Sequence, residues 1–163
     1  MKKYEIDGGI TIVENPDMDR PEYPVGEHMQ RNMKHIKMLC ETIKAIVPSG
    51  KNVNIWCSGS SGAIIGALVS LKLYKKSAMV CICHVKKDGE NHHGGTRCTP
   101  LTGNTYDIIV DDFVAMGDTV MRILRQSGNV DCLAICGGMY KSRLSLFTKS
   151  NIIDTVICRS YDD

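Results

Sequence analysis

The 163 residues of this chain fit one domain, residues 1–163, which is long enough to bury a hydrophobic core without metal or disulfide support. The net charge of +2, from 20 basic and 18 acidic residues, excludes the strongly charged surface of a nucleic-acid or membrane binder. Only six Tyr, two Phe and one Trp are present, which leaves little surface for base stacking. We expect no nucleic-acid partner and no membrane partner.

Eight cysteines raise the question of a disulfide framework. Six of them lie in apolar, strand-like runs, where cysteine acts as a small hydrophobic residue: Cys57, Cys81, Cys83, Cys132, Cys136 and Cys158. The N-terminus lacks the apolar segment of a signal peptide, and the longest apolar stretch, residues 63–71, is too short to span a bilayer. We therefore expect reduced thiols and a cytoplasmic protein.

The first third of the chain predicts a hairpin or edge strand, irregular chain and one helix. Glycines and alternating apolar residues indicate the hairpin within residues 1–24, where prolines follow. From residue 25 to residue 47, apolar side chains recur at steps of four and three, which is one face of an amphipathic helix. Residues 48–50, Pro-Ser-Gly, end that helix.

Residues 52–57 are predicted to form the first central strand. A small-residue loop follows, and then an apolar helix that begins with residues 63–71 and ends at Lys75-Lys76; the loop contains Ser58, Gly59, Ser60 and Ser61. A strand, a Gly/Ser turn and a helix together suit an oxyanion, because small residues let backbone N–H groups approach it. A tight turn without a ligand fits the same pattern about equally well, and the Walker and dinucleotide-binding spacings are absent.

A polar, glycine-bearing loop over residues 86–97 follows the next predicted strand, residues 78–85. Loops of this length inside a compact domain are usually functional or disordered. An alternative interpretation is a zinc site made by Cys81, Cys83, His92, His93 and Cys98. Its Cys-x-Cys spacing departs from that of structural zinc knuckles.

Residues 106–120 hold the most informative pattern. A β-branched run, residues 108–110, leads into Asp111 and Asp112, and a short loop then opens a helix near Gly117. Ligands bind parallel sheets beyond the carboxyl ends of the strands, and a helix N-terminus there suits a phosphate. Carboxylates beside a phosphate cradle suit a ligand that also carries hydroxyls or a magnesium ion.

The remaining chain predicts a helix ending at Gly128, a strand over residues 130–136 and a last strand over residues 155–158. A basic, serine-rich stretch near residues 141–143 precedes that last strand. Strands alternating with helices predict the α/β class: a doubly wound, mostly parallel sheet flanked by helices.

Three segments of the chain resemble the type I phosphoribosyltransferases. Residues 106–120 are similar to their phosphoribosyl pyrophosphate (PRPP) signature, with Met116-Gly117-Asp118-Thr119 in place of Thr-Gly-Gly-Thr. The loop over residues 58–61 lies where that family binds pyrophosphate. Residues 86–97 resemble the mobile loop of orotate phosphoribosyltransferases, Arg-Lys-x-x-Lys-x-His-Gly; Lys87 and His92 match it, whereas Lys86 and Glu90 depart from it.

The resemblance implies a type I phosphoribosyltransferase-like fold with a small, reduced hood made from residues 1–24 and the chain after Gly138. It assigns the ribose hydroxyls to Asp111 and Asp112, and catalysis to Lys87, His92 and Asp112. The 5′-phosphate would be bound by Ala115, Met116, Gly117, Asp118 and Thr119. Pyrophosphate would be bound by Ser58, Gly59, Ser60, Ser61, Lys86 and Lys87. Mg²⁺ would be held mainly through ligand and water near the two aspartates, and a homodimer is expected.

The function expected from this resemblance is transfer of ribose 5-phosphate from PRPP to a nucleobase, with release of pyrophosphate. The loop is orotate-like, but the choice between purine and pyrimidine stays open. One alternative is a non-catalytic regulatory or sequestering protein that binds PRPP or a nucleotide on the same fold. Another is a doubly wound protein with neither activity.

Overall fold

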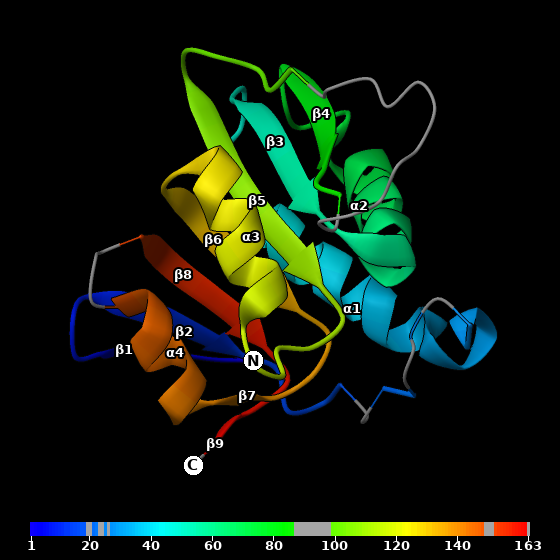
Figure 1. The fold of residues 1–163 in the computed structure, drawn as a ribbon. Helices are drawn as coiled ribbons and strands as arrows, with labels where there is room; N and C mark the ends of the chain where they lie inside the picture. Colours follow the sequence, from blue (N-terminus) through cyan, green and yellow to red (C-terminus); the bar gives the residue numbers. More distant parts are fainter. Residues whose placement is uncertain (19–20, 23–24, 26, 87–98, 149–151, 163) are drawn as a thin grey trace.

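The computed structural model describes residues 1–18, 21–22, 25, 27–86, 99–148 and 152–162. The chain folds into three layers, with a seven-stranded sheet between two pairs of helices (Figure 1). This confirms the expected α/β class, a mostly parallel sheet covered by helices on both faces. Among the described residues, no helix is both long and apolar enough to cross a lipid bilayer.

The main sheet is parallel except at one edge. Its spatial order is β1-β2-β8-β6-β5-β3-β4, and only β1 runs antiparallel to its neighbour, β2. A second, two-stranded sheet joins β7 and β9. The strands are β1 (Lys2–Ile6), β2 (Ile10–Glu14), β3 (Asn52–Cys57), β4 (Met79–His84), β5 (Thr105–Asp111), β6 (Val130–Ile135), β7 (Met139–Tyr140), β8 (Ile153–Cys158) and β9 (Tyr161–Asp162).

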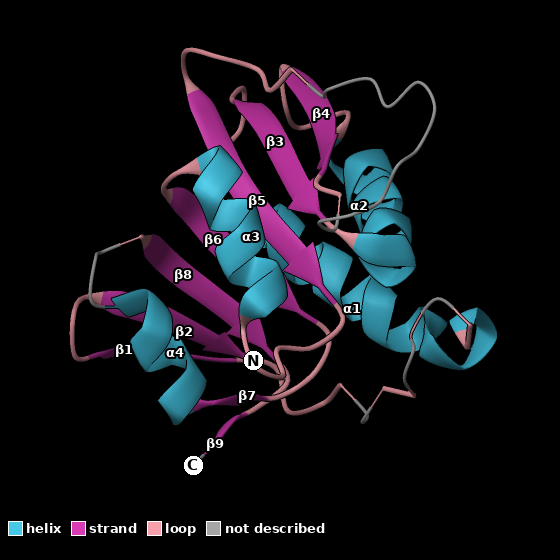
Figure 2. Cartoon of the chain, in the orientation of Figure 1, coloured by secondary structure: helices cyan, strands magenta, loops and turns pink. Residues whose placement is uncertain are grey.

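The helices divide between the two faces of the sheet, as Figure 2 shows. They are α1 (Met29–Ile46) and α2 (Gly59–Leu73) on one face, and α3 (Asp118–Ser127) and α4 (Lys141–Thr148) on the other. The alternation of side chains along each strand produces the two cores: Ile108 and Val110 of β5 pack with α1 and α2, and Ile109 packs on the opposite side. A strand buried on both faces explains the uninterrupted apolar run of β5.

The connections reverse direction between β3 and β5. From β3 the chain passes through α2 to β4 at one edge, and it then returns across β3 to form β5 on the other side. The two strands nevertheless pair directly, with Trp56 opposite Ile109. Open α/β sheets bind ligands at such a switch point, beyond the carboxyl ends of the strands.

A buried polar network fixes the amino-terminal half of the sheet. Asn54, which is 2% exposed, donates to the Leu101 carbonyl oxygen at 3.0 Å and accepts from the Leu101 N–H at 2.8 Å. The Asp107 carboxylate accepts from Asn54 Nδ2 at 3.1 Å and from Trp56 Nε1 at 2.7 Å. The Asp107 N–H donates to Asp131 at 2.6 Å. The network therefore holds the segment that leads into β5 against β3.

Several boundaries differ from the sequence-based expectation. The first helix begins at Met29 instead of residue 25, because the preceding residues turn before the helix and bury Val25. The second begins at Gly59 instead of residue 63, so most of the predicted Gly/Ser loop is the first turn of α2. The basic, serine-rich stretch forms helix α4, which was not predicted.

Most of the described residues that were expected to form a reduced hood are strands of the main sheet or a helix that packs on it. Residues 2–14 form the β1–β2 hairpin at the sheet edge, as predicted, and α4 and β8 complete the far half of the molecule. Of the segments expected to form the hood, two lie outside the main sheet and its helices, at the carboxyl ends of the strands. They are the described part of the segment between β2 and α1, and the short β7–β9 sheet.

Candidate functional site

The site lies at the switch point, where the carboxyl ends of β3 and β5 meet. The pairing of Trp56 with Ile109, continued two residues further, places Ser58 beside Asp111. A helix begins just beyond each strand, at Gly59 for α2 and at Asp118 for α3. Two helix N-termini, each with backbone N–H groups that have no acceptor within the helix and with a positive dipole end, therefore flank the acidic pair. This arrangement suits a ligand with two separate anionic groups.

Asp111 and Asp112 are buried and held by backbone N–H groups, with 8% and 7% of their surfaces exposed. One Asp111 carboxylate oxygen accepts the N–H of Asp112 at 2.9 Å, and one Asp112 oxygen accepts the N–H of Phe113 at 3.0 Å. The second Asp112 oxygen lies 3.5 Å from the Val25 nitrogen, which donates to it. These contacts fix the positions of two carboxylates that would otherwise be costly to bury.

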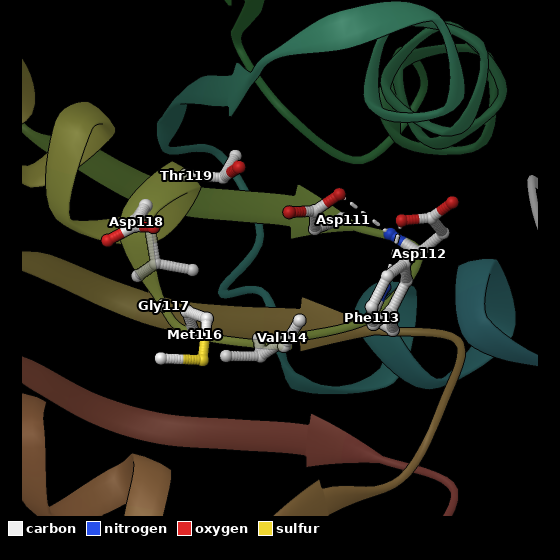
Figure 3. Close-up of a pocket in the computed structure, with 10 residues that line it drawn as sticks. Asp111, Asp112, Phe113, Val114, Met116, Gly117, Asp118 and Thr119 are labelled. Carbon is white, nitrogen blue, oxygen red and sulfur yellow. Dashed lines mark hydrogen bonds between the residues drawn. The ribbon is translucent and has the colours of Figure 1, made fainter.

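The loop after β5 curves around a cavity of about 220 Å³ that is lined by residues 111–120. Its curvature requires Gly117, which has a φ of +91° and caps α3, a conformation that other residues adopt only with strain. Figure 3 shows the acidic pair at one end of the loop and Thr119 near the other. The cavity is smaller than the roughly 300–1,000 Å³ typical of drug-sized ligands, so it suits a small ligand or one part of a larger ligand.

The side chains of Met116 and Asp118 point away from Asp111 and Asp112 (Figure 3). Met116 is 61% exposed, and Asp118 is also exposed. Their backbone N–H groups remain part of the loop, and the directions of these groups depend on the main-chain conformation and not on the side chains. The two departures from the Thr-Gly-Gly-Thr pattern therefore place no bulky or acidic group within the acidic end of the cavity.

The turn after β3 is packed tightly against β5. Ser58 is 6% exposed, and its hydroxyl donates to the Val85 carbonyl oxygen at 2.7 Å, which ties this turn to the end of β4. Gly59 has a φ of +69° at the start of α2. A Cβ added at Gly62 would lie 3.3 Å from the Cys57 Cβ and 3.4 Å from the Val110 carbonyl oxygen, so glycine lets α2 approach both strands.

The predicted site residues fall into two groups. The residues from Ser58 to Ser61 and from Asp111 to Thr119 lie in neighbouring turns at the carboxyl ends of β3 and β5, and the cavity is lined by residues 111–120. Lys86 directly follows Val85, the residue that accepts the Ser58 hydrogen bond, and is partly exposed. Lys87 and His92 lie outside the described residues, as do His93 and Cys98 of the alternative zinc site.

Two residues near the acidic pair were not predicted from the sequence. Val25 contributes its N–H to Asp112 across 87 positions of chain, so no local pattern indicates the contact. Cys136 directly follows β6; burial, reinforced by the nearby Asp112 carboxylate, raises the pKa of this thiol to about 12. Cys136 therefore stays neutral and adds no charge to the acidic pair.

No protein-family model matches the chain, and a search of curated proteins gives no match to its sequence.

Proposed function

We propose that this protein is a phosphoribosyltransferase that transfers ribose 5-phosphate from PRPP to a nucleobase and releases pyrophosphate. The observation that carries the proposal is the meeting of an acidic pair and two helix N-termini at the switch point between β3 and β5. PRPP carries hydroxyls between a 5′-phosphate and a pyrophosphate, so its groups alternate in the same way. The resemblance of residues 106–120 to the PRPP signature supports the same assignment.

Each part of the ligand has a counterpart in the site. The carboxylates of Asp111 and Asp112 would accept hydrogen bonds from the 2′ and 3′ hydroxyls, since both are held in place by backbone N–H groups. The turn from Ala115 to Thr119 would surround the 5′-phosphate with N–H groups and one hydroxyl. The start of α2, with Lys86, would bind pyrophosphate.

The reaction would replace pyrophosphate at the anomeric carbon with a base nitrogen, through a transition state with oxocarbenium character. The contribution of the chain is to align the base with that carbon and to stabilise the negative charge that develops on pyrophosphate. Lys87 and His92, by their resemblance to the orotate-type loop, would supply positive charge there. They would also help to exclude water, which otherwise hydrolyses PRPP.

Magnesium would be held at this site mainly by the phosphates of the bound ligand and by water. Among the described residues, no three side chains of the kinds that bind metals form a group, but the carboxylates of Asp111 and Asp112 lie beside the expected phosphates. Mg²⁺ in enzymes is commonly held by one or two carboxylates, phosphate oxygens and water, and it supplies charge neutralisation on the leaving group.

A second candidate is a regulatory or sequestering protein that binds PRPP or a nucleotide without turnover. It is favoured by polar groups on both sides of the site that are bonded within the protein. The Ser58 hydroxyl donates to Val85, and Asp112 accepts from Val25. An enzyme must rearrange such contacts in each cycle, whereas a binding protein has to do so once.

Calorimetry with PRPP and Mg²⁺ tests ligand binding. The double variant Asp111→Asn with Asp112→Asn should bind PRPP at least about 10-fold more weakly than wild type, since charge-assisted hydrogen bonds are lost. The matched control is Asp118→Asn, which removes an exposed negative charge from the same loop and should not weaken binding. Equal affinity of wild type and the double variant, or no binding by wild type, rejects both the enzyme and the PRPP-binding protein.

Incubation with PRPP, Mg²⁺ and a panel of purine and pyrimidine bases separates the two candidates. Pyrophosphate release that depends on one of the bases establishes the transferase and identifies its substrate. Tight binding without base-dependent release establishes the regulatory or sequestering protein. Sedimentation at equilibrium in the same buffer tests the homodimer that the family resemblance implies.

A further inference from the structure

A pair of thiols lies on β4, at the opposite edge of the sheet from β1. Cys81 and Cys83 are two residues apart, so their side chains emerge on the same face of the strand. Cys83 is 1% exposed and belongs to the core on the α3 and α4 side, whereas Cys81 is only partly buried. The pair is therefore anchored at one end and open to solvent at the other, and neither thiol has a part in the ribosyl transfer proposed above.

The two sulfur atoms are close enough to bind one ion. Cys83 Sγ lies 3.9 Å from Cys81 Sγ, and Cys81 Sγ lies 3.8 Å from the carbonyl oxygen of Thr99. Two thiolates on one tetrahedral ion with metal–sulfur bonds of about 2.3 Å are separated by roughly 3.8 Å. The distance between the two sulfur atoms is thus already close to that of a metal-bound pair of thiolates.

The third candidate ligand atom, the carbonyl oxygen of Thr99, is held in place by the fold. Thr99 lies two residues before Leu101, whose N–H and carbonyl groups both bond to the buried side chain of Asn54. The carbonyl of Thr99 is therefore positioned next to Cys81 by the same network that fixes the sheet.

We propose that Cys81 and Cys83 bind a single thiophilic d¹⁰ metal ion, Zn²⁺ or Cu⁺, with the Thr99 carbonyl oxygen or water completing its coordination. Both thiols lose their protons to solvent on binding, because the thiolate is the ligand. Two metal–sulfur bonds then replace the S–H contacts from Cys83 to Cys81 and from Cys81 to the Thr99 carbonyl oxygen. The site is independent of the acidic pair at the switch point, so it stands whether or not PRPP binds.

The test uses the full-length reduced protein under anaerobic conditions. Co²⁺, the spectroscopic substitute for Zn²⁺, should give a near-ultraviolet thiolate-to-metal charge-transfer band at one equivalent per chain. Zn²⁺ should abolish this band. Competition with a chromophoric chelator then gives the Zn²⁺ affinity, and the same competition with a Cu⁺-selective chelator gives the Cu⁺ affinity. Binding of either ion at one equivalent per chain supports the site.

Cys81→Ser should lose the band and bind either ion at least 10-fold more weakly. The matched control is Cys40→Ser, because Cys40 is a buried thiol on α1 whose pKa burial raises to about 11, and it should bind as wild type does. Cys83→Ser should behave as Cys81→Ser does. Because Cys83 is in the core, its variant can fail to fold, and the result for Cys81→Ser then decides the test. No charge-transfer band and no Cu⁺ binding in wild type, or equal binding by Cys81→Ser, overturns the proposal.

Discussion

At the scale of single residues, the backbone of Gly117 controls the shape of the cavity lined by residues 111–120. Its φ of +91° costs a residue with a Cβ about 1–2 kcal/mol, so Gly117→Ala should destabilise the fold by that amount and distort the loop. Under the proposed function, PRPP and Mg²⁺ should raise the melting temperature of wild type, and we expect the variant to lose most of that increase. Differential scanning fluorimetry with and without ligand measures both effects.

Gly8 provides the matched control for Gly117. It has a φ of +93° in the turn between β1 and β2, and a Cβ there would meet no other atom. Gly8→Ala should therefore carry the same backbone penalty but keep the full response to PRPP. An equal loss of ligand response in both variants would mean that the loop shape has no particular role in binding.

The ionisation of Asp131 affects the free energy of unfolding. Burial raises the pKa of its carboxyl, and the neighbouring carboxylates of Asp107 and Asp154 raise it further. A raised pKa in the folded state means that ionised Asp131 costs stability at neutral pH and that this cost disappears as the pH falls below the unfolded value of about 3.9. Asp131→Asn keeps an oxygen for the Asp107 N–H and removes the charge.

We therefore expect Asp131→Asn to raise the melting temperature at pH 7. Because the group is only partly buried, the gain is at most about 1 kcal/mol, or about 2–4 °C for a chain of this length. Calorimetric melting curves from pH 7 down to pH 4 should show the difference shrinking. A constant difference across that range would assign the effect to something other than ionisation.

At the scale of elements, the close approach of α2 to the sheet depends on Gly62. The Cβ position at Gly62 is already 3.3 Å from Cys57 and 3.4 Å from the Val110 carbonyl oxygen, so a larger side chain must push the helix outward. Gly62→Val should cost about 1–3 kcal/mol through overpacking, as measured by urea unfolding. Ala67→Val, on the exposed side of the same helix, should cost only a few tenths of a kcal/mol.

The elements differ in how well the sequence predicted them. Strands such as β5 were predictable because burial on both faces leaves an unbroken apolar run. Helix α4 was not, because its few apolar residues, among them Leu144 and Phe147, are set in a serine-rich, basic stretch, and its position is decided by packing against the sheet. The start of α2 was misplaced because Gly and Ser favour turns locally, whereas here they form a helix that must lie close to β3 and β5.

The candidate site was predictable to the extent that it depends on local sequence. The acidic pair and the glycine that opens α3 follow one another in the chain, so their arrangement could be predicted. The contact between Val25 and Asp112 and the neutral thiol of Cys136 arise from the tertiary fold, which brings distant segments to one edge. The strand order that makes this edge a switch point likewise depends on pairings between distant residues.

At the scale of the whole molecule, packing protects most of the described thiols from reaction. Burial raises the pKa of Cys40 to about 11 and that of Cys136 to about 12, and it also raises the pKa of Cys132, so these groups are almost entirely protonated at pH 7.5. We expect brief iodoacetamide treatment of the native protein to modify Cys81 among the described cysteines. The three core thiols should react only after denaturation, as peptide mass spectrometry would show; rapid native labelling of Cys132 would contradict this packing.

The position of β2 has a consequence for how the chain is made. β2 lies between β1 and β8, with Thr11 paired to Thr155, so β2 must wait for a pairing partner that is translated 144 residues later (155 − 11 = 144). At about 5–20 residues per second, this delay is roughly 7–30 s. Throughout this delay β2 can pair with β1, but its other side, which pairs with β8 from Thr11 to Glu14, has no partner strand. During translation the nascent hairpin is therefore a natural target for chaperones, and a chain that stops before β8 keeps that edge exposed permanently.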